Sequence, residues 1–364
     1  MLEQLTHDLA ASKHLNDGQI RHAVDQLADE KIAVRIKADF LTALAKKGES
    51  IAEIAAFAAA LRDKSIQPQL DPETRAGEIL DVVGTGGDRL GTFNISTTVA
   101  ILCAAAGVTV AKHGNRAVTS HVGSADVIEA LGIRVDLSPT EAARSLREHG
   151  FAFFFAPNYH PAFKHISPAR KLCAERGQRT IFNFLGPLLN PARPTAQLVG
   201  VPRPELCEPL ARVLQSLGVR RAMVVCGEVP GAKRQVSGSA HTPRTTQHDS
   251  EYLDELSTLG PNTIAEFYQE HGFTVSTLSP EQFPLQTATL NDLLGGDRAA
   301  NAEIVRRILR GEERGPKRDA VLLNAAAALF VAGKTKSLVE GWDLAGVTID
   351  SGKASRKLNE LAAS

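Results

Sequence analysis

The stretch EILDVVGTGGDRLGTFNISTTVAILCAAAGVTVAKHG, residues 78–114, decides the fold class of this chain. Residues 78–84 have the short apolar run of a strand, residues 96–108 have the pattern of a helix built from small residues, and residues 108–114 have a second strand pattern. The alternation continues with a helix over 124–133, a strand over 151–157, a helix over 206–218 and a strand over 221–227. Strands that alternate with helices predict an α/β fold with a mainly parallel sheet flanked by helices.

The chain before this stretch has a different pattern. Residues 20–30 and 36–48 repeat apolar side chains at three- and four-residue spacing, and no strand pattern occurs there. A further helix is expected to begin at Ser50, because Ser50 and Glu53 have the spacing of a capping box. Residues 65–78 contain two prolines and few apolar residues, as in a linker. We therefore expect a helical domain over 1–68, to which later helices can contribute, and an α/β domain over 76–364.

Composition restricts the class of protein. Acidic and basic residues balance at 41 each across 364 residues, which argues against a nucleic-acid binder but allows a local positive pocket. The four cysteines form no CxxC pair and have apolar or helical neighbours, as reduced thiols do. No apolar run reaches the roughly 18–20 residues of a membrane span, and the N-terminus does not have the pattern of a signal peptide. We expect a cytoplasmic protein with no membrane partner.

Two polar segments follow the first two strands of the α/β pattern. GTGGD, Gly84–Asp88, is neither a Walker A loop nor a GxGxxG motif, and alone it is more typical of a tight turn. Five polar residues lie between Thr92 and Thr98, where a helix start exposes N–H groups suited to phosphate, and one of them is expected to cap that helix. Lys112–Ser120 supplies positive charge and hydrogen-bond donors after the next strand. Because such strand ends line one crevice, we predict a site for a phosphorylated ribose.

Two further groups are ambiguous by themselves. Asp254 and Glu255 are adjacent carboxylates that suit magnesium, although they equally suit the first turn of a short helix. Arg170 could hold an acidic substrate through two parallel hydrogen bonds, although it lies in a basic stretch typical of a helix surface.

Taken together, these segments resemble the anthranilate phosphoribosyltransferase family. The resemblance rests on GTGGD, NIST (Asn94–Thr97), KHGNR (Lys112–Arg116), GSAD (Gly123–Asp126), RTIFNFLGPLLNP (Arg179–Pro191), DEL (Asp254–Leu256) and DAVLLNAAAALFVAGK near the end of the chain. The motifs occur in the family's order and span the whole chain. The resemblance implies a nucleoside phosphorylase/phosphoribosyltransferase-like fold, a cytoplasmic homodimer, and magnesium-dependent transfer of phosphoribose from phosphoribosyl pyrophosphate to the amino group of anthranilate in tryptophan biosynthesis.

The resemblance also assigns roles to residues. Those that match positions binding phosphoribosyl pyrophosphate are Gly84, Gly87, Asp88, Thr92, Asn94, Ile95, Ser96, Thr97, Lys112, His113, Gly114, Asn115, Arg116, Ala117, Val118, Thr119, Ser120 and Ser124. The magnesium (Mg²⁺) ligands are matched by Ser96, Asp254 and Glu255, and the anthranilate contacts by Gly84, Asn115 and Arg170. Lys112, His113 and Asn115 are the candidate catalytic residues.

The chain departs from the family pattern at two places. Residues 171–178, KLCAERGQ, are longer than usual, and a long polar insertion, Val229–Ser250, precedes Asp254. Loops of that length are usually lids or disordered insertions.

Two alternatives to the transferase remain. One is a pyrimidine-nucleoside phosphorylase, which shares the fold and a similar KHGNR segment and uses free phosphate. The other is a non-catalytic homologue that binds nucleic acid, which should have a basic groove and a degraded pyrophosphate site.

Overall fold

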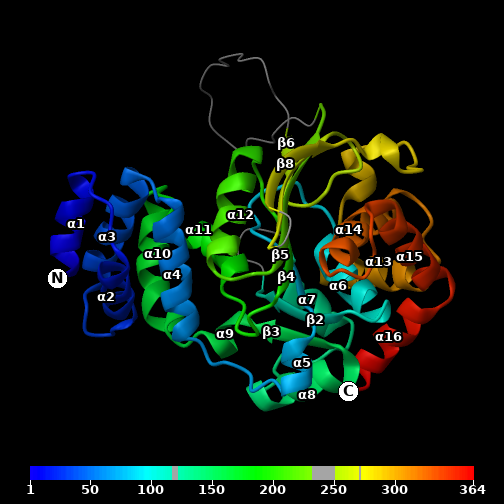
Figure 1. The fold of residues 1–364 in the computed structure, drawn as a ribbon, viewed down its shortest axis with the longest axis horizontal. Coiled ribbons are helices and arrows are strands. Elements are labelled where there is room, and N and C mark those ends of the chain that lie inside the picture. Colours follow the sequence, from blue (N-terminus) through cyan, green and yellow to red (C-terminus); the bar gives the residue numbers. More distant parts are fainter. Residues whose placement is uncertain (117–121, 232–250, 270–271) are drawn as a thin grey trace.

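Helices alone form the first part of the computed structural model, which describes residues 1–116, 122–231, 251–269 and 272–364. The bundle consists of α1 (Leu2–Ala10), α2 (Asp17–Ala28), α3 (Val34–Lys47) and α4 (Ile51–Asp63). It stands at one end of the molecule (Figure 1), where α10 (Phe163–Glu175) packs against α2 and α3. A later segment of the chain therefore joins the N-terminal helices.

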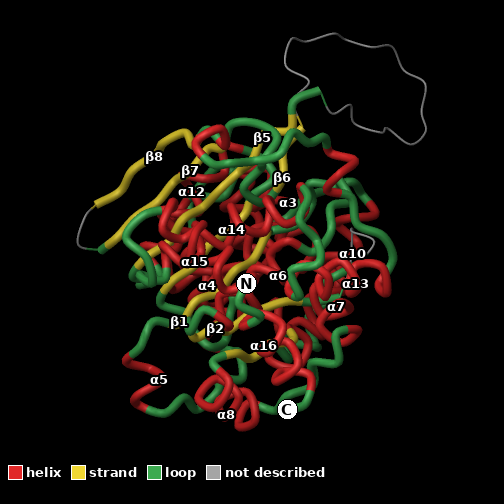
Figure 2. The backbone as a smooth tube through the Cα atoms, turned by 90° about the vertical axis from the view of Figure 1, so that its right-hand side faces the viewer, coloured by secondary structure: helices red, strands yellow, loops and turns green. Residues whose placement is uncertain are grey.

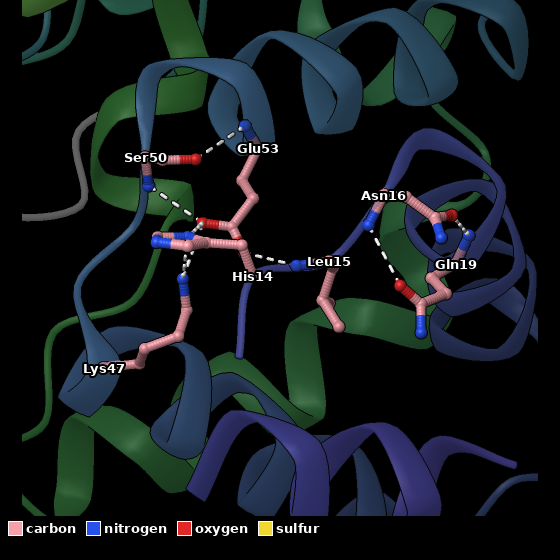
Figure 3. A network of polar contacts seen from close by, with 7 residues as sticks. All are labelled: His14, Leu15, Asn16, Gln19, Lys47, Ser50 and Glu53. Carbon is pink, nitrogen blue, oxygen red and sulfur yellow. Dashed lines mark hydrogen bonds and ion pairs between the residues drawn. The ribbon is translucent and has the colours of Figure 1, made fainter. Parts of the chain in front are cut away.

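A buried carboxylate ties this bundle together. Ser50 and Glu53 form the capping box predicted from their spacing, and the Glu53 side chain is fully buried. Its oxygens accept hydrogen bonds from the backbone N–H of Leu15 at 3.0 Å and from Lys47 Nζ at 2.6 Å, while His14 Nδ1 lies 3.3 Å away (Figure 3). Burial alone would raise the pKa of Glu53, but these bonds and that from Ser50 outweigh it and lower the pKa to about 2.

The α/β part is built on one mixed sheet. Its strands are β1 (Ile79–Gly84), β2 (Thr109–Gly114), β3 (Phe151–Phe155), β4 (Ala196–Gly200), β5 (Arg221–Val229), β6 (Glu251–Leu253), β7 (Asn262–Tyr268) and β8 (Gly272–Leu278). They lie in the order β3-β2-β1-β4-β5-β7-β8, and β6 pairs with the end of β5. The five strands from β3 to β5 are parallel, whereas β6, β7 and β8 run antiparallel to their neighbours. The predicted α/β fold is confirmed, and the antiparallel edge was not predicted.

Helices cover both faces of the sheet (Figures 1 and 2). One face carries α6 (Ile95–Ala105), α13 (Arg298–Leu309), α14 (Pro316–Val331), α15 (Leu338–Asp350) and α16 (Lys353–Ala362). The opposite face carries α11 (Phe182–Leu185) and α12 (Cys207–Ser216). Alternate residues of β5 point to opposite faces, so Met223 and Val225 belong to one core, while Val224 and Cys226 belong to a second core that continues into the N-terminal bundle.

Shorter helices complete the architecture. They are α5 (Pro72–Ala76), α7 (Ser124–Ala130), α8 (Pro139–His149), α9 (Ala156–Tyr159) and 3-10 turns at Gly186–Leu188, Pro204–Leu206, Pro280–Gln282 and Leu290–Leu293. Helix α5 lies inside the expected linker, where Asp71 caps it. All four cysteines are buried and free, as expected. Across the described ranges, no helix has both the length and the apolar character needed to cross a membrane.

Candidate active site

A crevice of about 1310 Å³ opens at the carboxyl ends of β1 and β2. Fifteen of the residues singled out in the sequence line it: Gly84, Gly87, Asp88, Thr92, Asn94, Ile95, Ser96, Thr97, Lys112, His113, Gly114, Asn115, Ser124, Asp254 and Glu255. Arg116 and Arg170 are described but do not line it. Ala117, Val118, Thr119 and Ser120 lie outside the described residues. The structure thus gathers most of the candidates at one edge of the sheet.

The glycine-rich loop after β1 needs its glycines for two reasons. Gly86 and Gly87 have φ values of 73° and 92°, which side-chain-bearing residues rarely adopt, and a Cβ at either would meet nothing within 4 Å. At Gly84 the reason is space, because a Cβ there would lie 2.9 Å from Asp254 Cγ. The loop is therefore open toward the crevice and in close contact with an acid distant in sequence.

The start of α6 is not capped as the sequence suggested. Asn94 is the N-cap residue, but its side chain makes no capping hydrogen bond. The backbone N–H of Ser96 instead donates to Glu255 Oε1 at 3.1 Å. The expectation that one of the nearby polar residues caps this helix is wrong, because a carboxylate from a distant segment takes the cap position. The helix start and the acid pair thus form one unit.

Asp254 and Glu255 follow directly on β6, and no helix begins there. The alternative that placed them in the first turn of a helix is wrong. Pairing of β6 with β5 sets Leu253 opposite Gly227, which brings Asp254 to the strand ends. There the backbone N–H of Gly86 donates to Asp254 Oδ2 at 2.6 Å.

Both acids are half-buried at the crevice, and their surroundings shift their pKa values. Burial raises the pKa of Asp254 well above its ordinary value, and the neighbouring Asp88 and Glu255 raise it further. Burial also raises the pKa of Glu255, although Lys112 opposes this. Among the described residues, no group of three or more His, Cys, Asp or Glu is arranged to hold a metal ion by itself. A divalent cation at this pair would therefore need further oxygens, such as the Ser96 hydroxyl and those of a bound substrate.

Lys112 is a cation that interacts with Glu255. Its side chain is buried, and its Nζ donates to Val82 O at 2.6 Å and lies 3.4 Å from Ser96 Oγ. Burial lowers the pKa of Lys112, whereas Asp81 and Glu255 counteract this. Asp81 was not identified from the sequence, yet it is fully buried beneath the site, accepts from His113 N–H at 3.2 Å, and has its pKa raised by burial to about 6.

Arg116 is directed away from the crevice. Its Nη1 forms ion pairs with Asp126 at 2.9 Å and Glu129 at 3.1 Å, and its guanidinium lies over the ring of Phe155. Sequence placed it with its neighbours in KHGNR, but sequence alone does not give the direction of a long side chain.

Arg170 lies behind the crevice at the end of a row of rings. His113 lines the crevice and packs on His160 at 5.3 Å between ring centroids, and His160 packs on Phe163 at 5.6 Å. The Arg170 guanidinium lies 5.8 Å from the Phe163 ring centroid and 5.1 Å from that of Phe182. Burial and the adjacent His160 lower the pKa of His113 to about 3, so its ring is neutral and weakly basic at pH 7.

The sequence analysis did not identify one wall of the crevice, which lies beside the segment that follows the glycine loop. Residues 288–291, Leu294 and Gly295 line it, held by an isolated bridge between Thr92 and Leu294 and by the Gly295 N–H donating to Gly91 O at 2.9 Å. Its sequence, ATLNDLLGG, has only the paired glycines as a signal, and they suggest nothing more than a turn.

Comparisons with known proteins show which family the chain resembles. Residues 3–65 match the helical bundle domain of a glycosyl transferase family, and residues 76–248 and 244–355 match that family's a/b domain. Anthranilate phosphoribosyltransferase from Lacticaseibacillus casei is 44% identical over 363 residues, covering 100% of this chain and 97% of the relative. The enzyme of the same name from Petrotoga mobilis is 42% identical over 361 residues, covering 99% and 96%.

Solved structures give the same result. A crystal structure of anthranilate phosphoribosyltransferase from Thermus thermophilus superposes with a TM-score of 0.84 at 39% identity, covering 99% of this chain and 98% of the other. The Saccharomyces cerevisiae enzyme in complex with PRPP and Mg superposes with a TM-score of 0.82 at 27% identity, covering 100% and 97%. The same yeast enzyme in complex with 4-fluoroanthranilate has a TM-score of 0.81 at 25% identity, covering 100% and 97%.

Proposed function

The chain belongs to the anthranilate phosphoribosyltransferase family, and we propose that it performs the reaction of that family in the crevice at the strand ends. It transfers phosphoribose from phosphoribosyl pyrophosphate to the amino group of anthranilate, giving N-(5-phosphoribosyl)anthranilate and pyrophosphate in tryptophan biosynthesis. The observation that carries this proposal is the convergence of the glycine loop, Lys112 and the acid pair on one crevice. No relative described above is a nucleoside phosphorylase.

The phosphoribosyl pyrophosphate would lie between the glycine loop and the start of α6. The open glycines of the loop and the N-terminus of α6 suit its phosphates. The Arg116 side chain forms ion pairs with Asp126 and Glu129. Arg116 would therefore contact phosphoribosyl pyrophosphate through its backbone or after a change of rotamer.

The acids and hydroxyl that face the crevice fit Mg²⁺. Asp254 and Glu255 supply carboxylate oxygens, and Ser96 supplies a hydroxyl close to both Lys112 and Glu255. Their raised pKa values reflect negative charges that burial and the neighbouring Asp88 disfavour, and a divalent cation would neutralise them. When bound, the cation supplies charge stabilisation for the departing pyrophosphate.

Anthranilate would approach from the side of Asn115 and Gly84. The Asn115 side-chain oxygen accepts from the Arg116 N–H at 2.8 Å, which orients the carboxamide. The rings between His113 and Phe182 offer apolar surfaces to an aromatic acid, and Arg170 beyond them remains a cation suited to its carboxylate.

The chemistry needs positioning more than proton transfer. Anthranilate is a weak nucleophile because the ring delocalises its lone pair, so the bond from the anomeric carbon to pyrophosphate breaks early. The amine nitrogen then bonds to that carbon and releases a proton. Lys112 and the loop N–H groups stabilise the leaving charge. With its pKa near 3, His113 is poorly matched to act as a general base and is better suited to orient the acceptor.

We extend the proposal to organisation and location. The helical domain over 1–68 and the α/β domain over 76–364 would act together in a cytoplasmic homodimer. The family resemblance supports the dimer, and four free cysteines suit a reducing compartment.

The decisive experiment follows anthranilate fluorescence with the purified chain. We expect the signal to fall only when phosphoribosyl pyrophosphate and Mg²⁺ are both present, with release of pyrophosphate. Phosphate-dependent cleavage of a pyrimidine nucleoside, without consumption of anthranilate, would overturn the proposal.

A further inference from the structure

Two buried asparagines bracket the backbone immediately after the acid pair. Asn324, in the middle of α14, accepts from the Leu256 N–H at 2.9 Å and donates Nδ2 to Leu256 O at 2.9 Å. Asn262, at the start of β7, accepts from the Ser257 N–H at 2.6 Å and donates Nδ2 to Ser257 O at 3.0 Å. Each carboxamide therefore pairs with both polar groups of one residue, as a neighbouring strand would.

Asn324 is a polar residue in an apolar stretch of α14. Its neighbours in α14 form the run Leu322–Leu329 of leucines and alanines, and Asn324 itself is fully buried. Asparagine is a poorer helix former than either residue, and a buried carboxamide needs partners. One donor hydrogen bond returns to Ala320 O in the same helix, but the remaining two bonds go to Leu256.

The other side of the segment is closed by strand-end glycines. A Cβ on Gly200, the last residue of β4, would fall within contact distance of the Asp254 carbonyl group and 3.1 Å from Glu255 N. A Cβ on Gly227 in β5 would lie 2.7 Å from Glu255 O. The backbone from Asp254 to Ser257 thus lies directly on the ends of the strands, with no space for a side chain beneath it.

Electrostatic repulsion disfavours the positions that Asp254 and Glu255 occupy. Asp254 and Glu255 are adjacent, half-buried and of like charge, so their mutual repulsion favours an outward movement of the segment. A bracket made of neutral carboxamides holds the backbone without adding charge at the site. It also uses none of the carboxylate oxygens, of which one accepts from the Gly86 N–H and one from the Ser96 N–H.

We propose that Asn324 and Asn262 are positioning residues that hold Asp254 and Glu255 in the arrangement needed to bind Mg²⁺ together with phosphoribosyl pyrophosphate. This inference rests on the function proposed above. Neither asparagine lines the crevice, so both act through the backbone of Leu256 and Ser257.

The test uses Asn324→Leu, which keeps the branched outline of four heavy atoms and removes both bonds to Leu256. The matched control is Leu329→Ala, which removes buried volume from the same helix and leaves Asn324 in place. For each full-length protein, the first measurement is the binding of Mn²⁺, a spectroscopic substitute for Mg²⁺, in the presence of phosphoribosyl pyrophosphate. The second is the Mg²⁺ concentration that gives half of the maximal rate, and the third is the KM for anthranilate.

We expect Asn324→Leu to weaken Mn²⁺ binding and raise the half-saturating Mg²⁺ concentration by about 10- to 100-fold, as loss of a ligand's supporting partner does. The KM for anthranilate should change less than about twofold, and the control should match the wild type in all three measurements. If Asn324→Leu does not fold, Asn324→Ser and Asn262→Ser carry the same expectation.

Failure of the proposed function and failure of this inference give different experimental results. A wild-type protein that never consumes anthranilate overturns the proposed function. An active wild type whose asparagine variants bind Mn²⁺ normally, while melting at a lower temperature as the control does, shows that the bracket serves stability alone and overturns this inference.

Discussion

Replacing Gly227 with alanine should displace the acid segment by a calculable amount. A Cβ at this position would lie 2.5 Å from both Cβ and N of Ser257 and 2.7 Å from Glu255 O. Carbon atoms in contact prefer about 3.5–4.0 Å, so the backbone above must rise by about 1 Å. A misplacement of about 1 Å costs roughly 100-fold in rate, or about 2.7 kcal/mol of activation free energy.

The assay is the initial rate of anthranilate consumption as phosphoribosyl pyrophosphate and Mg²⁺ are varied. Gly346→Ala is the control. Gly346 lies within α15, and a Cβ there would have its nearest neighbour, Arg318 Nη2 of α14, at 4.0 Å. We expect kcat/KM for phosphoribosyl pyrophosphate to fall by roughly 100-fold in Gly227→Ala and to stay unchanged in the control. A Gly227→Ala protein with wild-type kcat/KM and an unchanged melting temperature would refute the close packing of the acids on the strand end.

Three further predictions concern charged groups. Arg170→Ala should raise the KM for anthranilate by about 10- to 100-fold in steady-state kinetics, as loss of a charge-assisted hydrogen bond does, and equal loss of phosphoribosyl pyrophosphate affinity would contradict its role. Asp254→Asn combined with Glu255→Gln should abolish the Mg²⁺-dependent rate, and normal turnover would place the metal elsewhere. Glu53→Gln should lower the free energy of unfolding by about 3 kcal/mol at pH 7, because it leaves Lys47 buried without its partner. Since the pKa of Glu53 is lowered from 4.5 to about 2 on folding, this difference should be complete above pH 4.5 and shrink as the pH falls toward 2, which urea denaturation at several pH values would measure.

Local signals were sufficient for much of the fold. The Ser50 and Glu53 spacing gave the start of α4, and strand–helix alternation gave the parallel part of the sheet. Strand-end glycines marked the loop whose Gly86 and Gly87 require positive φ. In these cases the determining residues lie within a few positions of one another.

The rest of the site depends on contacts between distant segments. The cap of α6 comes from Glu255, 159 residues after Ser96, so no local pattern contains it. The crevice wall near Leu294 is held by pairing with Thr92. The antiparallel strands β7 and β8 differ from these cases, because they pair locally, with Tyr268 opposite Gly272, and this local pairing was not predicted. Asn324 had one faint signal, a single polar residue within a run of leucine and alanine.

The pairing of β5 with β6 has a consequence for protein engineering. Val229 pairs with Glu251 and Gly227 with Leu253, so the ladder sets where the chain enters the acid pair at Asp254. The number of residues that join the two strands does not enter that register. Because closing a connection costs only about 0.6 kcal/mol more for each doubling of its length, we expect insertions into this connection to leave the pairing of β5 with β6 unchanged. A fluorescent reporter or an affinity tag could be built into the chain there, beside the reaction it would monitor, without redesign of the scaffold.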